Sequence, residues 1–302
     1  MRDIHAMSPD HGRLRLRSVG LSDIRKPLTV QRPDATRTLA VTFRVAVDLP
    51  SERKGSDLSR NAEILAEVVD QTATRPVASL ESACSAIARE LLARHPSATE
   101  ASVEASAEYF LRQGVSEEKR SFEDYLLLAE AHSTRGSDGS ITLVRSIGAE
   151  AVGMTACPCA METCRDRLVE EFPLLARPEL KDLPMITHNQ RNRTRLVFGL
   201  PDATEVEADD LIAAIEAAQS SPTYAILKRG DEAQVVLDAH RHPKFVEDVL
   251  RDLLANLPDR FRSLPDATIV RASTVSEESI HKYNVEASHQ VTLGELRTSG
   301  AR

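Results

Sequence analysis

The chain has 302 residues, of which 41% are apolar and 28% charged, as is ordinary for a soluble globular protein. Its net charge of −8, its 4% aromatic content and its lack of tryptophan argue against a nucleic-acid partner. No run approaches the roughly 20 apolar residues of a membrane span, and residues 1–18 lack the apolar centre of a signal peptide. We therefore expect a cytoplasmic protein with no membrane partner.

The predicted elements of the first half follow a polar and basic stretch, residues 1–37. Its steps Lys26-Pro27 and Arg32-Pro33 predict an N-terminal arm ahead of the fold. Alternation of apolar and polar residues predicts strands, and apolar residues at helical spacing predict helices. In chain order, we predict a strand at residues 39–47, helices at 57–73 and 80–93, a strand at 103–109, a segment at 122–132 that is a strand or alternatively a helix, and a strand at 141–155.

The predicted elements of the second half partly repeat this order. They are a mostly helical insertion at residues 161–185, a strand at 194–200, helices at 208–219 and 244–257, a strand at 233–237 between them, a strand at 267–273, and an extended stretch beyond residue 282. Strands, two helices and strands, twice over, predict an α+β fold with the helices on one face of each sheet. We accordingly predict two modules, residues 38–155 and residues 156–302.

Three of the four cysteines are crowded behind the strand predicted at residues 141–155, unlike a disulfide framework. Cys157 and Cys159 are separated only by Pro158, too closely for a comfortable disulfide. Thiolates are preferred ligands of zinc and ferrous iron, so this pair indicates either a metal ligand with a second thiol nearby or two small buried residues. Cys84 lies in an apolar helical pattern, which predicts a packed core residue.

A histidine follows the two cysteines about thirty residues later, in the arginine-rich segment 188–193. His188 is therefore either a second metal ligand or a solvated surface histidine. Arg191, Arg193 and Arg195 are spaced to project from one side of a strand. They could pair with a phosphate through their planar guanidinium groups, or simply solvate an edge strand.

Several carboxylates could join such a site. Glu232 lies in a charged turn and could complete a Cys-His-carboxylate ligand set, although most such turns are solvated. Glu247 and Asp248 occupy the first turn of a predicted helix, where the macrodipole favours acids. One carboxylate there could instead accept two N–H groups from a guanine edge. Glu278 and His281 could form an acid/base pair or approach a metal-bound water.

Together these segments resemble the type IB GTP cyclohydrolase family, most closely its archaeal branch. The resemblance covers essentially the whole chain and rests on motifs in the family's order. These are Val19-Gly20, Lys26-Pro27, Asp48-Leu49-Pro50, Lys54-Gly55, Ser59-Arg60, Thr155 to Cys159, His188 to Arg191, Leu227-Lys228-Arg229, Asp231-Glu232, Pro243 to Asp248, and Glu278 to His281.

The resemblance implies tandem tunnelling-fold (T-fold) modules, each an antiparallel sheet backed by two helices. It implies a homo-oligomer, a dimer or homotetramer, with active sites between subunits. It also implies one divalent metal ion per subunit, with Fe²⁺ favoured and Mn²⁺ or Zn²⁺ as alternatives. The implied roles are metal binding by Cys157, His188 and Glu232, catalysis by Cys159, Glu278 and His281, guanine binding by Glu247, and triphosphate binding by Arg53, Lys54 and Arg191.

The implied reaction is hydrolytic opening of the guanine imidazole ring of GTP at C8, with release of formate. The product would be a 7,8-dihydroneopterin for tetrahydromethanopterin- or folate-type cofactor biosynthesis. The insertion between Cys159 and His188 and the sequence Thr-Ala-Cys-Pro-Cys favour the 2′,3′-cyclic phosphate product over the triphosphate. The chain lacks the P-loop pattern, so GTPase chemistry of that type is not expected.

One position departs from the family pattern. Tyr283 stands where the family commonly has a second histidine, and a tyrosine is a poor metal ligand. This weakens the expectation of a proton relay built from both histidines. Two alternatives of the same fold therefore stay open, a catalytically inactive purine- or pterin-binding oligomer and a nitrile reductase that uses a cysteine nucleophile and a nicotinamide cofactor.

Overall fold

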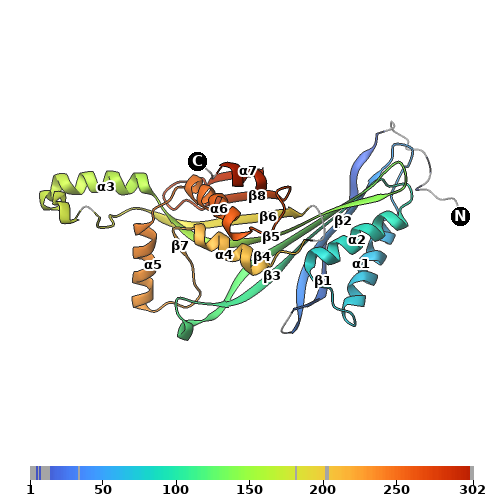
Figure 1. Ribbon diagram of the computed structural model, residues 1–302, viewed down its shortest axis with the longest axis horizontal. Coiled ribbons are helices and arrows are strands. Elements are labelled where there is room, and N and C mark those ends of the chain that lie inside the picture. Colours follow the sequence, from blue (N-terminus) through green and yellow to red (C-terminus); the bar gives the residue numbers. More distant parts are fainter. Residues whose placement is uncertain are drawn as a thin grey trace. The chain divides into compact units, whose positions relative to one another are not determined.

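The computed structural model describes residues 5, 7, 14–32, 35–180, 182–200 and 204–299 (Figure 1). The chain divides into two compact units, each discontinuous in sequence. Unit 1 takes its described residues from 1–109, 126–147 and 199–204, and unit 2 takes its own from 110–125, 148–198 and 205–302. The predicted division into contiguous modules at residues 38–155 and 156–302 stays a prediction.

Strands in the described residues are hydrogen-bonded in the order β1-β2-β3-β4-β5-β6-β8-β9, and β7 pairs with β5. The pairs β1–β2, β2–β3, β5–β7 and β8–β9 are antiparallel. The strands are β1 (Leu16–Gln31), β2 (Thr36–Leu49), β3 (Glu100–Gln113), β4 (Ser121–Arg135), β5 (Ile141–Ala156), β6 (Asn189–Leu200), β7 (Ser221–Pro222), β8 (Ile269–Ser276) and β9 (Val285–Thr292).

Seven α-helices lie within the described residues. They are α1 (Leu58–Thr72), α2 (Leu80–Arg94), α3 (Pro158–Glu171), α4 (Ala208–Ala218), α5 (Arg229–Arg241), α6 (Val246–Arg260) and α7 (Leu293–Ser299), and 3₁₀ turns cover Glu117–Lys119, Pro173–Ala176 and Pro178–Leu180. The fold is therefore a mixture of helices and an antiparallel sheet, as the sequence predicts at that level. None of the helices in this part of the chain is both long enough and apolar enough to cross a membrane.

In unit 1, α1 and α2 lie side by side against β1 and β2 (Figure 1). The predicted alternation in β2 explains this layer, because Val41, Phe43 and Val45 are buried while Arg44 is exposed. Phe43 pairs across the sheet with Ala105 of β3. Cys84 of α2 is fully buried, which confirms it as a core residue, and burial raises the pKa of its thiol.

In unit 2, α4 packs against α6, and α6 packs against β8 and β9. Buried leucines such as Leu211 on α4 and Leu253 on α6 supply the apolar contact. Phe198 of β6 meets Phe261, just beyond α6, edge to face, with ring centroids 4.8 Å apart. Unit 2 thus has its own core.

The predicted N-terminal arm is wrong for residues 16–31, which form strand β1. This strand pairs with β2, for example Leu28 with Leu39. Pro27 and a register shift beside Asp23, whose φ is 59°, hide the strand pattern in the sequence. Both features are tolerated because β1 lies at the end of the strand order, where one side needs no partner. Residues 1–4, 6, 8–13 and 33–34 of the predicted arm lie outside the described residues.

The predicted strand at residues 233–237 is also wrong, because these residues belong to helix α5. The charged segment before it starts the helix, since the Asp231 carboxylate accepts a 3.0 Å hydrogen bond from the backbone N–H of Lys228. Lys119 donates to the same carboxylate at 2.7 Å. Val235 and Ala239, four residues apart, are the buried side of α5. The ambiguous segment at residues 122–132 is a strand, β4.

Candidate active site

One pocket in unit 2, of about 210 Å³, gathers five of the predicted site residues. It lies where β5 and β8 end and where β6 and α6 begin. Its lining includes the predicted Cys157, His188, Glu247, Glu278 and His281, together with Thr155, Gln190, Lys244, Ser276 and Tyr283. A thiol, two imidazoles and two carboxylates thus converge on a single cavity.

The two predicted nitrogen and sulfur ligands are neighbours in the sheet. Cys157 follows the last residue of β5, and His188 precedes the first residue of β6. The backbone N–H of Cys157 donates to the carbonyl oxygen of His188 at 3.1 Å, and the Thr187 hydroxyl donates to the carbonyl oxygen of Cys157 at 2.7 Å. Cys157 is also the N-cap of α3, where its Sγ accepts a 3.4 Å hydrogen bond from the backbone N–H of Ala160.

The His188 ring is held on one side by an amide. Its Nδ1 lies 2.9 Å from Oε1 of Gln190, and the histidine side chain is only 12% exposed. Gln190 Nε2 in turn donates to Oε1 of Glu278 at 3.3 Å. Glu278 is 9% exposed and also accepts from the Ser276 hydroxyl at 3.0 Å. Imidazole and carboxylate are therefore joined through one glutamine side chain.

A buried polar layer continues along β6 from Gln190. Asn192 and Thr194 follow at alternate positions and are fully buried. The Asn192 amide donates to Oε1 of Gln219 and to the hydroxyl of Thr274, both at 2.8 Å. Gly153 of β5 lies against this layer, because a Cβ atom there would stand 2.2 Å from Cγ of Gln219. Alternating polar residues on a buried strand face were the available sequence signal for this layer, which the sequence reasoning missed.

The two acids that open α6 have different surroundings. The Asp248 carboxylate accepts from the backbone N–H of Phe245 at 3.1 Å and thus caps the helix. Glu247 lines the pocket instead. The helix N-terminus explains Asp248 fully, while Glu247 is the acid available to a ligand.

His281 stands between two other rings of the site. Its ring stacks on Tyr283 with centroids 5.0 Å apart and an interplanar angle of 10°. It meets His188 edge to face at a centroid distance of 6.3 Å. Tyr283 is 62% exposed, so the stack lies at the mouth of the pocket.

Several predicted residues are not part of this pocket. Glu232 is exposed in the first turn of α5, and Cys159 is exposed in the first turn of α3. Arg191 is exposed on β6, where its carbonyl oxygen accepts from the backbone N–H of Glu277 at 2.9 Å. Within the described part of this single chain, no three His, Cys, Asp or Glu side chains are grouped as metal ligands.

Arg191, Arg193 and Arg195 do share one face of β6, as their spacing predicts. However, β6 lies between β5 and β8, so it is not an edge strand. Glu150 accepts from Arg193 at 2.9 Å and from Arg195 at 2.7 Å. These two guanidinium groups are thus paired with a carboxylate, which leaves Arg191 as the member of the set most open to a phosphate.

Arg53 and Lys54 belong to unit 1. Arg53 lines a cavity of about 190 Å³ together with Arg60 and His95, whereas Lys54 is exposed beside it. His95 is 4% exposed, and its Nε2 and the Arg53 Nε are buried without a hydrogen-bond partner. Burial, and then the nearby Arg60 charge, hold the pKa of His95 below its ordinary value. Asp57 also lines this cavity and pairs with Arg53 at 3.6 Å and with Arg60 at 3.1 Å, so the Arg53 Nε is the donor that is left unused.

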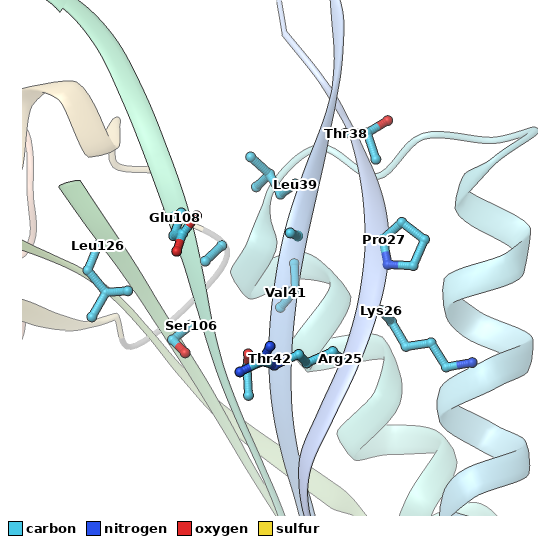
Figure 2. A pocket seen from close by; sticks show the side chains of 12 residues that line it. Arg25, Lys26, Pro27, Thr38, Leu39, Val41, Thr42, Ser106, Glu108 and Leu126 are labelled. Atoms are coloured by element: carbon cyan, nitrogen blue, oxygen red, sulfur yellow. The ribbon is translucent and has the colours of Figure 1, made fainter. Parts of the chain in front are cut away.

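A larger cavity of about 650 Å³ in unit 1 has fewer side chains suited to catalysis or metal binding (Figure 2). Figure 2 shows Arg25 and Pro27 from β1, Thr42 from β2, and Ser106 and Glu108 from β3 around it. Its lining has neither cysteine nor histidine. The pocket in unit 2 is therefore the candidate active site.

The convergence of a thiol, imidazoles and carboxylates in the unit 2 pocket is typical of an enzyme with acid–base or metal-assisted chemistry. The particular family follows from sequence comparison. The chain belongs to the type I GTP cyclohydrolase folE2 family, whose model matches residues 1–287. It is thus a member of a family of GTP cyclohydrolase enzymes.

Individual relatives agree with this assignment. GTP cyclohydrolase MptA 2 of Methanocella arvoryzae is 39% identical over 293 residues, which are 94% of this chain and 94% of the relative. GTP cyclohydrolase MptA of Methanococcoides burtonii is 38% identical over 292 residues, covering 94% of this chain and 92% of the relative.

Solved structures with a similar fold include uricases. A uricase from Bacillus fastidious matches with a TM-score of 0.52 at 13% identity, covering 94% of this chain and 96% of that chain. A uricase from Arthrobacter globiformis matches with a TM-score of 0.51 at 10% identity, covering 91% and 93%. At such low identity the likeness shows a shared fold alone.

Proposed function

We propose that this protein is a metal-dependent GTP cyclohydrolase that hydrolyses the guanine imidazole ring at C8 and releases formate. The observation that carries the proposal is the meeting of Cys157 and His188 in one pocket with Glu247, Glu278 and His281. Family membership supplies GTP as the substrate. The reaction consumes one water to open the ring to a formamide and a second water to release formate.

The donor set fits a divalent metal ion in part. A thiolate and a neutral imidazole are preferred ligands of zinc and ferrous iron, and Cys157 and His188 supply one of each. We propose that they hold Fe²⁺, with Mn²⁺ or Zn²⁺ as alternatives. Such an ion, when bound, lowers the pKa of its water and so provides hydroxide near neutral pH. Glu232 is exposed outside this pocket, so we propose that it would join as a ligand only from another subunit.

The remaining pocket residues have separate tasks in the proposed reaction. The Glu247 carboxylate would accept the two N–H groups on the guanine edge, which orients C8 in the pocket. Glu278 and His281 would hand protons to and from the ring nitrogens as the imidazole opens. Cys159, exposed on α3, would act in catalysis only at a surface shared with another subunit.

The size of the pocket supports an assembled site. At about 210 Å³ it is smaller than the roughly 300–1,000 Å³ typical of small-ligand sites. We propose that a homo-oligomer, a dimer or a homotetramer, completes it. The cavity of Arg53, Arg60 and His95 would then receive phosphate oxygens, with positive charge from Lys54 beside it and from Arg191 of another subunit.

We also propose the finer family assignment, the type IB, archaeal branch with tandem T-fold modules. This proposal is supported by the two pairs of helices that pack on strands, α1 with α2 in unit 1 and α4 with α6 in unit 2. We propose the 2′,3′-cyclic phosphate of dihydroneopterin as the product, as the resemblance to the archaeal branch implies. A triphosphate product is the alternative.

The proposal is tested by incubating the purified protein with GTP and Fe²⁺, Mn²⁺ or Zn²⁺ under anaerobic conditions. Formate release and a pterin that fluoresces after oxidation are expected, and mass spectrometry of the product decides between cyclic phosphate and triphosphate. Guanine binding without turnover would favour the inactive purine-binding oligomer. Consumption of NADPH with a nitrile substrate would favour the reductase.

A further inference from the structure

We propose that Gln190 is a positioning residue that fixes the tautomer and the orientation of His188 and joins this imidazole to Glu278. The inference rests on the proposed function, in which His188 is a metal ligand. It concerns a residue that the sequence reasoning placed only inside a motif and to which it gave no task.

The direction of the Gln190 amide follows from hydrogen-bond chemistry. A carboxylate can only accept hydrogen bonds, so the Glu278 oxygen at 3.3 Å must face the NH₂ group of Gln190. The same NH₂ group lies 3.1 Å from the hydroxyls of Thr155 and Ser276. The two hydrogens of the NH₂ group can serve two of these three oxygens at a time, and the amide oxygen is left on the opposite side, where Nδ1 of His188 lies at 2.9 Å.

The tautomer of His188 follows from this direction. The amide oxygen has no hydrogen to donate, so Nδ1 of His188 must carry the proton. In the neutral imidazole the lone pair is then on Nε2, the atom left to bind a metal ion. The alternative partner for Nδ1 is Oε2 of Glu278, but at 3.6 Å it is beyond hydrogen-bond distance.

The surroundings of Gln190 hold it in this position before any metal binds. Its side chain is on the same face of β6 as the buried Asn192 and Thr194. Thr155 and Ser276 are 1% and 2% exposed, so they fix the amide from the two neighbouring strands. Because these contacts order the side chain in advance, His188 loses little conformational freedom when it binds a ligand.

The test measures metal affinity of the full-length protein by competition with a chelator. Replacing the outer partner of a ligating histidine typically costs about 10- to 100-fold in metal affinity, and we expect this loss for Gln190→Ala. Gln190→Met, which keeps the length of the side chain without its polar atoms, should lose as much. Gln190→Glu keeps an oxygen acceptor for Nδ1–H but replaces the NH₂ group that faces Glu278 with an oxygen, so it should bind the metal more tightly than Gln190→Ala and less tightly than the parent protein.

Two further measurements separate positioning from general damage. The visible absorption of the Co²⁺-loaded protein reports on coordination geometry, and it should change more in Gln190→Ala and Gln190→Met than in Gln190→Glu, which keeps the acceptor for Nδ1–H. Gln234→Ala is the matched control, since Gln234 is exposed on α5 and alanine suits a helix. The melting temperature of each metal-free variant shows whether the fold is retained.

The outcomes are distinct. Metal affinity in Gln190→Ala and Gln190→Met equal to that of the parent would overturn the inference while leaving the metal site intact. A Gln190→Glu variant that binds as weakly as Gln190→Ala would also overturn it. If Cys157→Ala and His188→Ala retain the metal, the proposed metal site itself is wrong, and the role of Gln190 is wrong with it.

Discussion

The backbone N–H of Cys157 donates a 3.1 Å hydrogen bond to the carbonyl oxygen of His188, one residue beyond the ends of β5 and β6. This bond extends the hydrogen-bonded pairing of the neighbouring strands β5 and β6 by one residue. Residues about thirty positions apart therefore meet because the sheet brings their strand ends together. The backbone sets the relative positions of the two side chains. Neither side chain is needed for the hydrogen bond between the two backbones.

Substitution of either proposed ligand should therefore remove the metal without unfolding the protein. Cys157→Ala and His188→Ala keep the backbone hydrogen bond between these positions. We expect at least roughly 100-fold weaker metal binding and loss of formate release, with a melting temperature within a few degrees of the metal-free parent. Metal analysis after dialysis and a thermal scan provide the two readouts. A variant that melts far lower yet keeps activity per folded molecule would contradict the ligand assignment.

Glu247 should control purine recognition. Glu247→Gln replaces one acceptor of the carboxylate with a donor, so it faces the guanine edge with the wrong hydrogen-bond pattern. Hydrogen bonds to a charged group contribute roughly 1.5–3 kcal/mol, so kcat/KM for GTP should fall about 10- to 100-fold. Asp248→Asn is the comparison, because Asp248 caps the helix and should affect the melting temperature more than recognition. Equal kinetics for Glu247→Gln and the parent would rule out a guanine anchor.

Tyr283 should act through its ring rather than its hydroxyl. It stacks on His281 at 5.0 Å, and such a contact contributes roughly 0.5–1.5 kcal/mol. Tyr283→Phe should keep turnover within about twofold, whereas Tyr283→Ala should lose up to about tenfold. Steady-state kinetics of the two variants decide the matter. Should Tyr283→Phe fall as far as Tyr283→Ala, the hydroxyl takes part in proton transfer.

Arg53 should contribute to binding of the GTP phosphates and not to binding of the guanine base. Its Nε is buried without a hydrogen-bond partner in the cavity with Arg60 and His95. If phosphate oxygens bind there, Arg53→Ala should raise KM for GTP about tenfold while leaving guanosine binding unchanged. Arg262→Ala is a suitable control, since that side chain is 79% exposed and pairs only locally with Asp259. An unchanged KM for GTP would exclude this cavity as a phosphate site.

Asp48 should make the stability of the protein sensitive to acid. Burial alone would raise its pKa, but the backbone N–H groups of Glu100 and Thr99, the Thr99 hydroxyl and Arg15 donate to the carboxylate and hold its pKa below the ordinary 3.8. A lowered pKa means that the stabilisation is fully present above about pH 4 and is lost as pH falls through the folded-state pKa.

The corresponding measurement is urea unfolding of the parent and of Asp48→Asn across pH. We expect Asp48→Asn to lower the free energy of unfolding by roughly 1–3 kcal/mol at pH 6, and the difference to shrink toward pH 3. Asp259→Asn, at an 82% exposed side chain, should show no such trend. A difference that stays constant with pH would contradict the shifted pKa.

The sequence predicts those parts of the fold in which one face alone is buried. The alternation around Phe43 in β2 is an example, as is the alternation of Arg191, Arg193 and Arg195 in β6. The sequence does not predict strand β1, because an edge strand tolerates Pro27 and a register shift, and both interrupt the alternation of apolar and polar residues. The sequence does not predict helix α5, because the charged segment in which Asp231 starts the helix is also typical of a turn.

The candidate site is predictable only to the extent that its residues lie in motifs. Cys157, His188, Glu247, Glu278 and His281 meet in one pocket as the motifs indicate. The residues that position these side chains lie on neighbouring strands that are far apart in the sequence. The contacts of Gln190 with Thr155 and Ser276 are of this kind, and no spacing along the chain encodes them.

Gly153 faces a particular constraint on its evolution. Any side chain there would collide with Gln219, and Gln219 is bonded to Asn192 in the polar layer that continues from Gln190. Replacement of Gly153 by alanine or serine should therefore disturb this layer and reduce activity. Compensation would have to come from a shorter side chain at position 219, so the two positions should drift as a pair.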